Sequence, residues 1–300
     1  MDDAPTTSEA KRVREIALLS ILCYVAFSVC IPLIRLPRLH GHAMHSLVNW
    51  STLATTFLFM FLQLWLPRSL VALKMKAGAA LGAAAICAVC WLGLFSLLAH
   101  ARMHHHPMYS LDIVVGATGA PVALTVGLSC LGLLLSRIIR EVNVLLPVAF
   151  IAMPIDYIGA MTPTGYTADM VRHHPSVVQS VSVGVPVFHG VAPIGFIGPG
   201  DVLFVAFFLA VVQNLELNTK GTFWLMFALL TATMIVVTIL GVNVAALVPM
   251  GFAVLIANFR YFHLRRSEVF ATIYATLIVL ALATAFFVYS HHHFFPAHGK

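Results

Sequence analysis

Long apolar runs, separated by short polar segments, follow one another along the whole chain. They cover roughly residues 15–35, 46–66, 77–99, 110–136, 142–161, 201–215, 221–241, 243–259 and 267–290. Most of them approach the ~20 residues that a helix needs to cross the hydrocarbon core of a bilayer. Because lipid offers no hydrogen-bond partners, runs of this length satisfy their backbone as helices, and they are too long for barrel strands. The pattern predicts an all-α, polytopic transmembrane bundle of about nine helices.

Composition supports this interpretation. Of the 300 residues, 60% are hydrophobic and only 9% are charged, which excludes a soluble domain of any size. The first apolar run is too long for the core of a signal peptide and has no obvious cleavage site, so we expect it to be retained as the first helix.

The basic residues orient the predicted bundle. With the N-terminus in the cytoplasm and residues 1–14 as a cytoplasmic tail, 12 of the 17 basic residues lie inside and five lie outside. This split predicts an N-in, C-out arrangement by the positive-inside rule, and the net charge of +6 needs no nucleic-acid partner. The same basic residues are suited to contact anionic lipid head groups.

One long connection, roughly 162–200, falls on the outer side. It is polar at first and then rich in Val, Gly and Pro. We expect it to be too broken for a helix and too apolar for a solvated loop, with residues 181–188 able to form a strand.

Two of the eleven acidic residues fall inside apolar sequence. Asp156 lies toward the outer end of the fifth run, and Asp201 opens the sixth, whereas most other acids occupy helix starts or loops. An ionisable residue inside a membrane is costly and is a functional hypothesis by default. Because the fifth helix runs outward and the sixth returns, the two carboxylates are expected at similar depth, in the outer half of the bundle, where they can face each other.

Two facing carboxylates in a low-dielectric site share a proton. One then activates water as a general base, and the protonated one polarises a carbonyl or protonates a leaving amine. This is the chemistry of an aspartic protease. The glycines on either side of Pro199 would allow an extended peptide to approach closely beside Asp201.

The chain here resembles the GxGD-type intramembrane aspartyl proteases, meaning presenilin, signal peptide peptidase and their microbial relatives. Gly198-Pro199-Gly200-Asp201 matches the GxGD element, and Asp156-Tyr157 stands where the family has a Tyr-Asp pair. Residues 243–249 stand where the family carries Pro-Ala-Leu, and they supply Ala245, Ala246 and Leu247 at the outer end of the eighth predicted helix.

The resemblance covers roughly residues 145–255 and implies a catalytic region there. It implies an intramembrane aspartic endopeptidase, without a cofactor, that cleaves single-pass transmembrane helices or signal-peptide remnants in a prokaryotic inner membrane. By the same analogy, residues 181–188 would pair with the unwound substrate. The chain departs from the family in the order of Asp156 and Tyr157, in a missing proline and in an extra C-terminal helix.

Other interpretations stay open. Asp201 is a residue type that favours the N-cap of a helix, and Asp156 can reach interfacial water. Prepilin peptidases also use a GxGD, but usually follow it with Lys-Leu, whereas Val202-Leu203-Phe204 follows here. A non-enzymatic carrier, whose aspartates bind a cation or a proton, is the main functional alternative.

Histidines are the second chemical feature. By the predicted topology 14 of the 15 lie outside, several of them in a His-rich tail at 291–300. His100 and His104 have helical i, i+4 spacing, which makes an outer-face metal-binding protein a further alternative. A solvated, pH-responsive surface is the simpler explanation, because no Cys or carboxylate cluster joins them. His189, between the two aspartates in sequence, is placed to tune them.

Cys87 and Cys90 form a CxxC that we interpret as helix packing.

Overall fold

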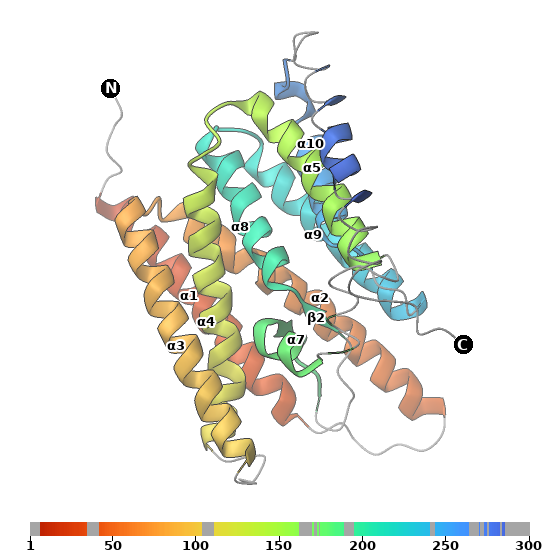
Figure 1. The fold of residues 1–300 in the computed structure, drawn as a ribbon. Coiled ribbons are helices and arrows are strands. Elements are labelled where there is room, and N and C mark those ends of the chain that lie inside the picture. The colour runs from red at the N-terminus through yellow and green to blue at the C-terminus, as the bar shows by residue number, and fades with distance from the viewer. Residues whose placement is uncertain are drawn as a thin grey trace. The chain divides into compact units, whose positions relative to one another are not determined.

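The computed structural model describes residues 7–34, 42–103, 111–161, 170, 173, 175–188, 195–240, 244–263, 270, 273–274, 276–282 and 284–285. Its helices are α1 (Thr7–Leu33), α2 (His42–Ala72), α3 (Ala77–Met103), α4 (Leu111–Ser136), α5 (Val142–Met161), α7 (Pro175–Val181), α8 (Pro199–Asn214), α9 (Thr219–Leu240) and α10 (Leu247–Ala257). A 3-10 turn, η1, covers Phe259–Tyr261, and two short strands are β1 (Val183–Gly184) and β2 (Phe196–Ile197) (Figure 1).

The helical fold class is confirmed. Within the described part of the chain, six helices, α1 to α5 and α9, are long and apolar enough to cross a membrane, and α8 and α10 are shorter apolar helices. These eight coincide with the first eight predicted runs, and the described residues between 270 and 285 are helical as well. Six such helices make the chain a multi-pass integral membrane protein. Helix α1 begins at Thr7, so the second half of the expected tail at 1–14 is helical.

The expectation that residues 162–200 contain no helix is wrong, because helix α7 forms at Pro175–Val181. The strand expected over 181–188 is confirmed only at Val183–Gly184, which pairs antiparallel with Phe196–Ile197. Val185 extends this pairing by donating its N–H to the carbonyl of Gly195, at 3.2 Å.

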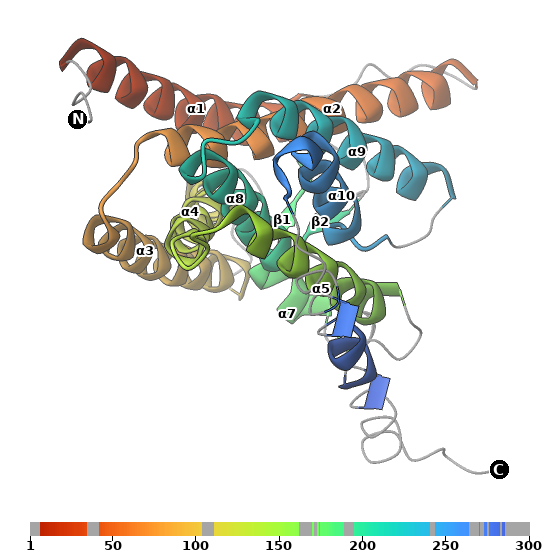
Figure 2. The ribbon, with the colours of Figure 1, turned by 90° about the horizontal axis from the view of Figure 1, so that it is seen from above.

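The chain divides into two compact units, which we describe separately. The first comprises Met1–Ile138 with Gln179–Ala210, and the second comprises Ile139–Val178 with Val211–Lys300. In the first unit α3 and α4 lie side by side, and α1 packs against α2 (Figures 1 and 2).

Polar side chains join α1 to α2 in the first unit. Tyr24 donates its hydroxyl hydrogen to Oε1 of Gln63 at 2.8 Å, and the hydroxyls of Ser20 and Ser69 are 2.5 Å apart. All four side chains are buried. Since lipid tails are as apolar as leucine, burial of apolar surface does not drive helix association in a membrane, and such hydrogen bonds supply part of what does.

In the second unit α5 and α10 run antiparallel and are held at three levels. At one end Asn143 exchanges two hydrogen bonds with the backbone of His263, at 3.1 and 3.3 Å. Further along, Met153 packs so closely on Gly251 that an added Cβ would lie 2.7 Å from its Sδ. Near the other end Asp156 bonds to the first residue of α10, Leu247. These contacts fix the register between the two helices.

A buried amide joins α9 to α10. Asn258, which is fully buried, accepts a hydrogen bond from the N–H of Asn218 at 2.9 Å. Its Nδ2 donates to Thr222 Oγ1 and to the carbonyl of Val254, each at 2.8 Å. Asn218 in turn caps α9 by accepting the N–H of Gly221 at 2.9 Å. One side chain therefore ties the start of α9 to the end of α10.

We expect Asn258→Ala to lower the free energy of unfolding by about 2 kcal/mol, because it removes a fully buried amide together with the acceptor of the Asn218 N–H and the donor to Thr222 Oγ1. SDS titration of the purified protein in mixed micelles measures this loss. Asn143→Ala, which removes an amide of the same type from an exposed pair, should cost less than about 1 kcal/mol. Equal losses in the two variants would contradict the role given to Asn258.

Candidate functional site

Asp156 lies thirteen residues beyond Asn143 in α5, about 20 Å along the helix axis. Its side chain is partly buried, and its Oδ2 accepts a hydrogen bond from the backbone N–H of Leu247 at 2.8 Å. The two residues are 91 positions apart in the sequence. The fold therefore brings one of the two predicted catalytic aspartates onto the predicted Ala-Leu element.

The backbone immediately before Leu247 is not helical. Val244 and Ala245 are irregular, Ala246 is the N-cap of α10, and the helix itself begins at Leu247. The expectation that Ala245 and Ala246 belong to the end of a helix is therefore wrong. With eleven residues, α10 spans about 17 Å, roughly half of a bilayer core.

Leu247 occupies the first position of α10, where the backbone N–H has no partner within the helix. The Asp156 carboxylate is the partner of that N–H, because the N-cap residue Ala246 supplies no side-chain hydrogen bond. The positive end of the helix dipole favours a carboxylate at this point in its ionised form. The partial burial of Asp156 acts against that form, so the two effects oppose each other at this carboxylate.

Asp201 lies in the first turn of α8, at its third residue, because the helix begins at Pro199 rather than at Asp201. Its Oδ2 accepts a hydrogen bond from the N–H of Gly198 at 3.1 Å. The interpretation of Asp201 as the N-cap residue is therefore wrong, but its carboxylate does cap the helix from within the first turn. The fold-back holds the carboxylate beside the Gly-Pro-Gly segment.

The two glycines of this segment differ in their surroundings. A Cβ at Gly198 would lie 3.3 Å from Oδ2 of Asp201, so a side chain there would disturb the carboxylate. A Cβ at Gly200 would meet nothing within 4 Å, and the residue is exposed. Open space beside Gly200 agrees with the expectation that another backbone can approach Asp201 closely.

Helix α8, which carries Asp201, is positioned by a close approach to α4. A Cβ at Gly132 would lie 2.6 Å from the carbonyl oxygen of Leu203 and 2.8 Å from the backbone nitrogen of Phe207. Only glycine permits this separation between the two backbones. All residues from Val205 to Val212 are buried, as expected for a helix that is apolar all round.

The predicted site residues thus fall into two groups. Asp156 lies in the second unit with Ala245, Ala246 and Leu247, whereas Asp201 lies in the first unit with Gly198 and Gly200. The adjacent Tyr157 has half of its side-chain surface exposed and makes no contribution to the bond with Leu247. Gly132 was not singled out from the sequence, because nothing distinguishes it there from the other glycines of the apolar runs.

No cluster of described side chains supports the metal-binding hypothesis. The described residues include no group of three or more His, Cys, Asp or Glu side chains that could hold a metal ion. His100 is exposed near the end of α3, while His104, like His189 and the tail at 291–300, lies outside the described residues.

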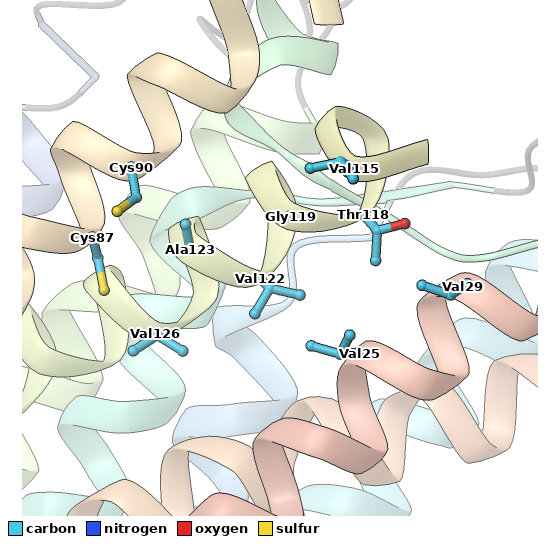
Figure 3. Close-up of a pocket in the computed structure, with 10 residues that line it drawn as sticks. All are labelled: Val25, Val29, Cys87, Cys90, Val115, Thr118, Gly119, Val122, Ala123 and Val126. Atoms are coloured by element: carbon cyan, nitrogen blue, oxygen red, sulfur yellow. The ribbon is translucent and has the colours of Figure 1, made fainter. Parts of the chain in front are cut away.

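A hollow of about 420 Å³ opens between α1, α3 and α4 of the first unit (Figure 3). Valines from α1 and α4 and the thiols of Cys87 and Cys90 line it, with the Thr118 hydroxyl as its polar side chain. Cys87 also packs on Gly127, where a Cβ would lie 3.1 Å from its own Cβ. The lining offers no acid–base groups, so we assign the hollow no part in catalysis.

Comparisons of the chain with protein-family models, with curated proteins and with solved structures find no match.

We expect Gly132→Ala to destabilise the protein by about 2 kcal/mol, because the added methyl group meets the α8 backbone rather than a movable side chain. Gly93→Ala is the matched control, since a Cβ there meets nothing within 4 Å, and it should be neutral or slightly stabilising. SDS titration compares the two. A neutral Gly132→Ala variant would show that the helices do not approach as described.

Replacing Asp156 separates its structural bond from its charge. Asp156→Ala should cost about 1–2 kcal/mol of unfolding free energy, because the Leu247 N–H loses its acceptor. Asp156→Asn keeps an acceptor oxygen and should lose less than half as much. The same titration decides, and equal stability of all three proteins would argue against the bond.

Proposed function

We propose that the protein is an intramembrane aspartic endopeptidase with Asp156 and Asp201 as its two catalytic carboxylates. Its substrates would be single-pass transmembrane helices or signal-peptide remnants. The observation that carries the proposal is the hydrogen bond from the Leu247 N–H to Asp156, because it joins two elements that the family resemblance had placed at one active site.

The two carboxylates have similar environments. Each accepts one backbone N–H at the start of a helix, which favours the ionised form that a general base requires. Asp201 accepts the N–H of Gly198 and lies beside the open space at Gly200. In the proposed reaction the ionised carboxylate removes a proton from water, which attacks the peptide carbonyl. The protonated carboxyl polarises that carbonyl and then protonates the leaving amine.

Substrate would bind in extended form next to the catalytic residues. Strand β2 (Phe196–Ile197) ends immediately before Gly198, and β1 already pairs with it in a short antiparallel ladder. A further strand added to this ladder would satisfy the main chain of an unwound helix inside lipid. Because Gly198 follows directly, such a strand would lead toward Asp201.

Topology completes the proposal. We infer nine membrane helices, with the N-terminus in the cytoplasm and the C-terminus outside, in a prokaryotic inner membrane. The charge split of the basic residues supports this orientation. It would place Asp156, Asp201 and Leu247 in the outer half of the bilayer, with neither a cofactor nor a nucleic-acid partner.

A carrier is the second candidate, and one observation favours it. Discontinuous helices whose N-termini meet charged groups near the midplane are typical of secondary transporters, and α10 begins at such a break with its N-terminus on Asp156. An outer-face metal-binding protein is the third, but no described cluster supports it.

Cleavage of a reporter single-pass helix by the purified protein in liposomes tests the proposal. Wild type should cut the reporter within its membrane segment, and both Asp156→Asn and Asp201→Asn should reduce the rate by at least about a thousandfold, because each removes one half of the acid–base pair. Mass spectrometry of the products locates the cut.

Glu141→Gln is the matched control, since it neutralises an exposed carboxylate at the start of α5 and should leave the rate unchanged. Absence of cleavage by wild type across several reporters, together with proton- or cation-coupled uptake that depends on Asp156, would replace the protease by the carrier.

A further inference from the structure

The turn between α2 and α3 gathers positive charge at one end of the first unit. Lys74 and Lys76 are exposed in it, and the guanidinium of Arg137, just beyond the end of α4, donates a hydrogen bond to the carbonyl of Met75 between them. Three cations thus meet within one short turn. No ion pair with a carboxylate neutralises Lys74, Lys76 or Arg137 among the residues that the structure describes.

The local backbone gives no reason for lysine at these positions. Lys74 has φ of 46°, in the left-handed region where glycine or asparagine normally ends a helix. Lys76 accepts the N–H of Ala80 and is therefore the N-cap of α3, where the helix dipole disfavours a cation and short polar residues are preferred. The sequence keeps long cationic side chains at two positions where folding alone favours other residues.

The position of Arg137 adds a third unfavourable choice. Its bond to Met75 brings the Arg137 guanidinium to the backbone between Lys74 and Lys76. Like charges gathered at one turn repel one another. An anion bound at the turn would relieve the repulsion among all three. The turn joins two membrane-spanning helices, so the anions within its reach are those of the membrane surface.

We propose that Lys74, Lys76 and Arg137 form a binding site for the phosphate of an anionic membrane phospholipid. The exposed ammonium groups and the fork of the guanidinium hold the head-group phosphate, while the acyl chains run along the lipid-facing side of the adjoining helices. The site lies in the first unit and does not depend on the proposed protease activity. It goes beyond a general excess of cytoplasmic charge, because it names three cations that one phosphate can bridge.

Native mass spectrometry of the full-length protein, with equal amounts of phosphatidylglycerol and phosphatidylcholine in the detergent, tests this site. Wild type should retain phosphatidylglycerol selectively. The triple variant Lys74→Asn, Lys76→Gln, Arg137→Gln should weaken that retention by about tenfold or more. Asparagine is chosen at position 74 because it tolerates positive φ.

The matched control is Lys11→Gln, Arg12→Gln, Arg14→Gln in α1, which lowers the net charge by the same three units, from +6 to +3. It should change retention by less than about threefold, because it acts through the surface potential alone. Equal losses in the two triple variants, or equal binding of both lipids by wild type, would overturn the site.

Two further arms keep the result interpretable. Lys74→Arg, Lys76→Arg retains both charges and leaves the guanidinium fork of Arg137 in place, so it should bind the anionic lipid as wild type does even if the neutral variant folds poorly; loss of binding there contradicts the proposal. Soluble glycerol phosphate at the same concentration should not displace the lipid. Displacement would show a site for free phosphate instead of a lipid site.

Discussion

The structure depends on one constraint: inside a bilayer every backbone N–H and C=O must find its partner within the protein. Long helices meet it largely by themselves, although the prolines inside α1, α2, α4 and α5 each remove one backbone donor. Wherever a helix is interrupted, some other group must replace the missing bonds. The break before α10 is such a place, and the Asp156 carboxylate is the group that supplies the partner. The acidic side chain of α5 and the irregular backbone before α10 thus meet at one hydrogen bond.

That coupling has a consequence for chemistry. A buried carboxylate ordinarily becomes protonated, because no other interaction offsets the loss of its hydration. At the first residue of a helix it gains a hydrogen bond and a favourable dipole, both of which act on the charged form. The same arrangement keeps Asp156 close to the segment Val244–Ala246, where the carbonyls of Ala245 and Ala246 accept N–H groups of α10. The start of α10 is thus fixed both by its own first turn and by a side chain of α5.

Much of the fold could be predicted from the sequence, and the exceptions have physical causes. Apolar runs located eight helices, because membrane spans need only length and hydrophobicity. The start of α10 was misplaced, since Ala245 and Ala246 are good helix formers locally and only a contact with a residue 91 positions away occupies the N–H at which the helix begins. Helix α7 was missed because the abundance of Val, Gly and Pro over residues 162–200 was interpreted as too irregular for any helix, although seven residues suffice for α7.

The candidate site likewise has parts that could be predicted from the sequence and parts that could not. Asp156, Asp201 and the Gly-Pro-Gly segment were visible because a charge or a pair of glycines is conspicuous in an apolar chain. The parts that position them were not. Gly132 has the same local signal as its neighbours, yet the space above its Cα sets how closely α8 approaches α4. Asn258 resembles any polar residue after a helix, yet it is fully buried and bonds both α9 and α10. Sequence thus exposes groups that are costly in lipid, whereas the contacts that make them tolerable are long-range and emerge only in the folded chain.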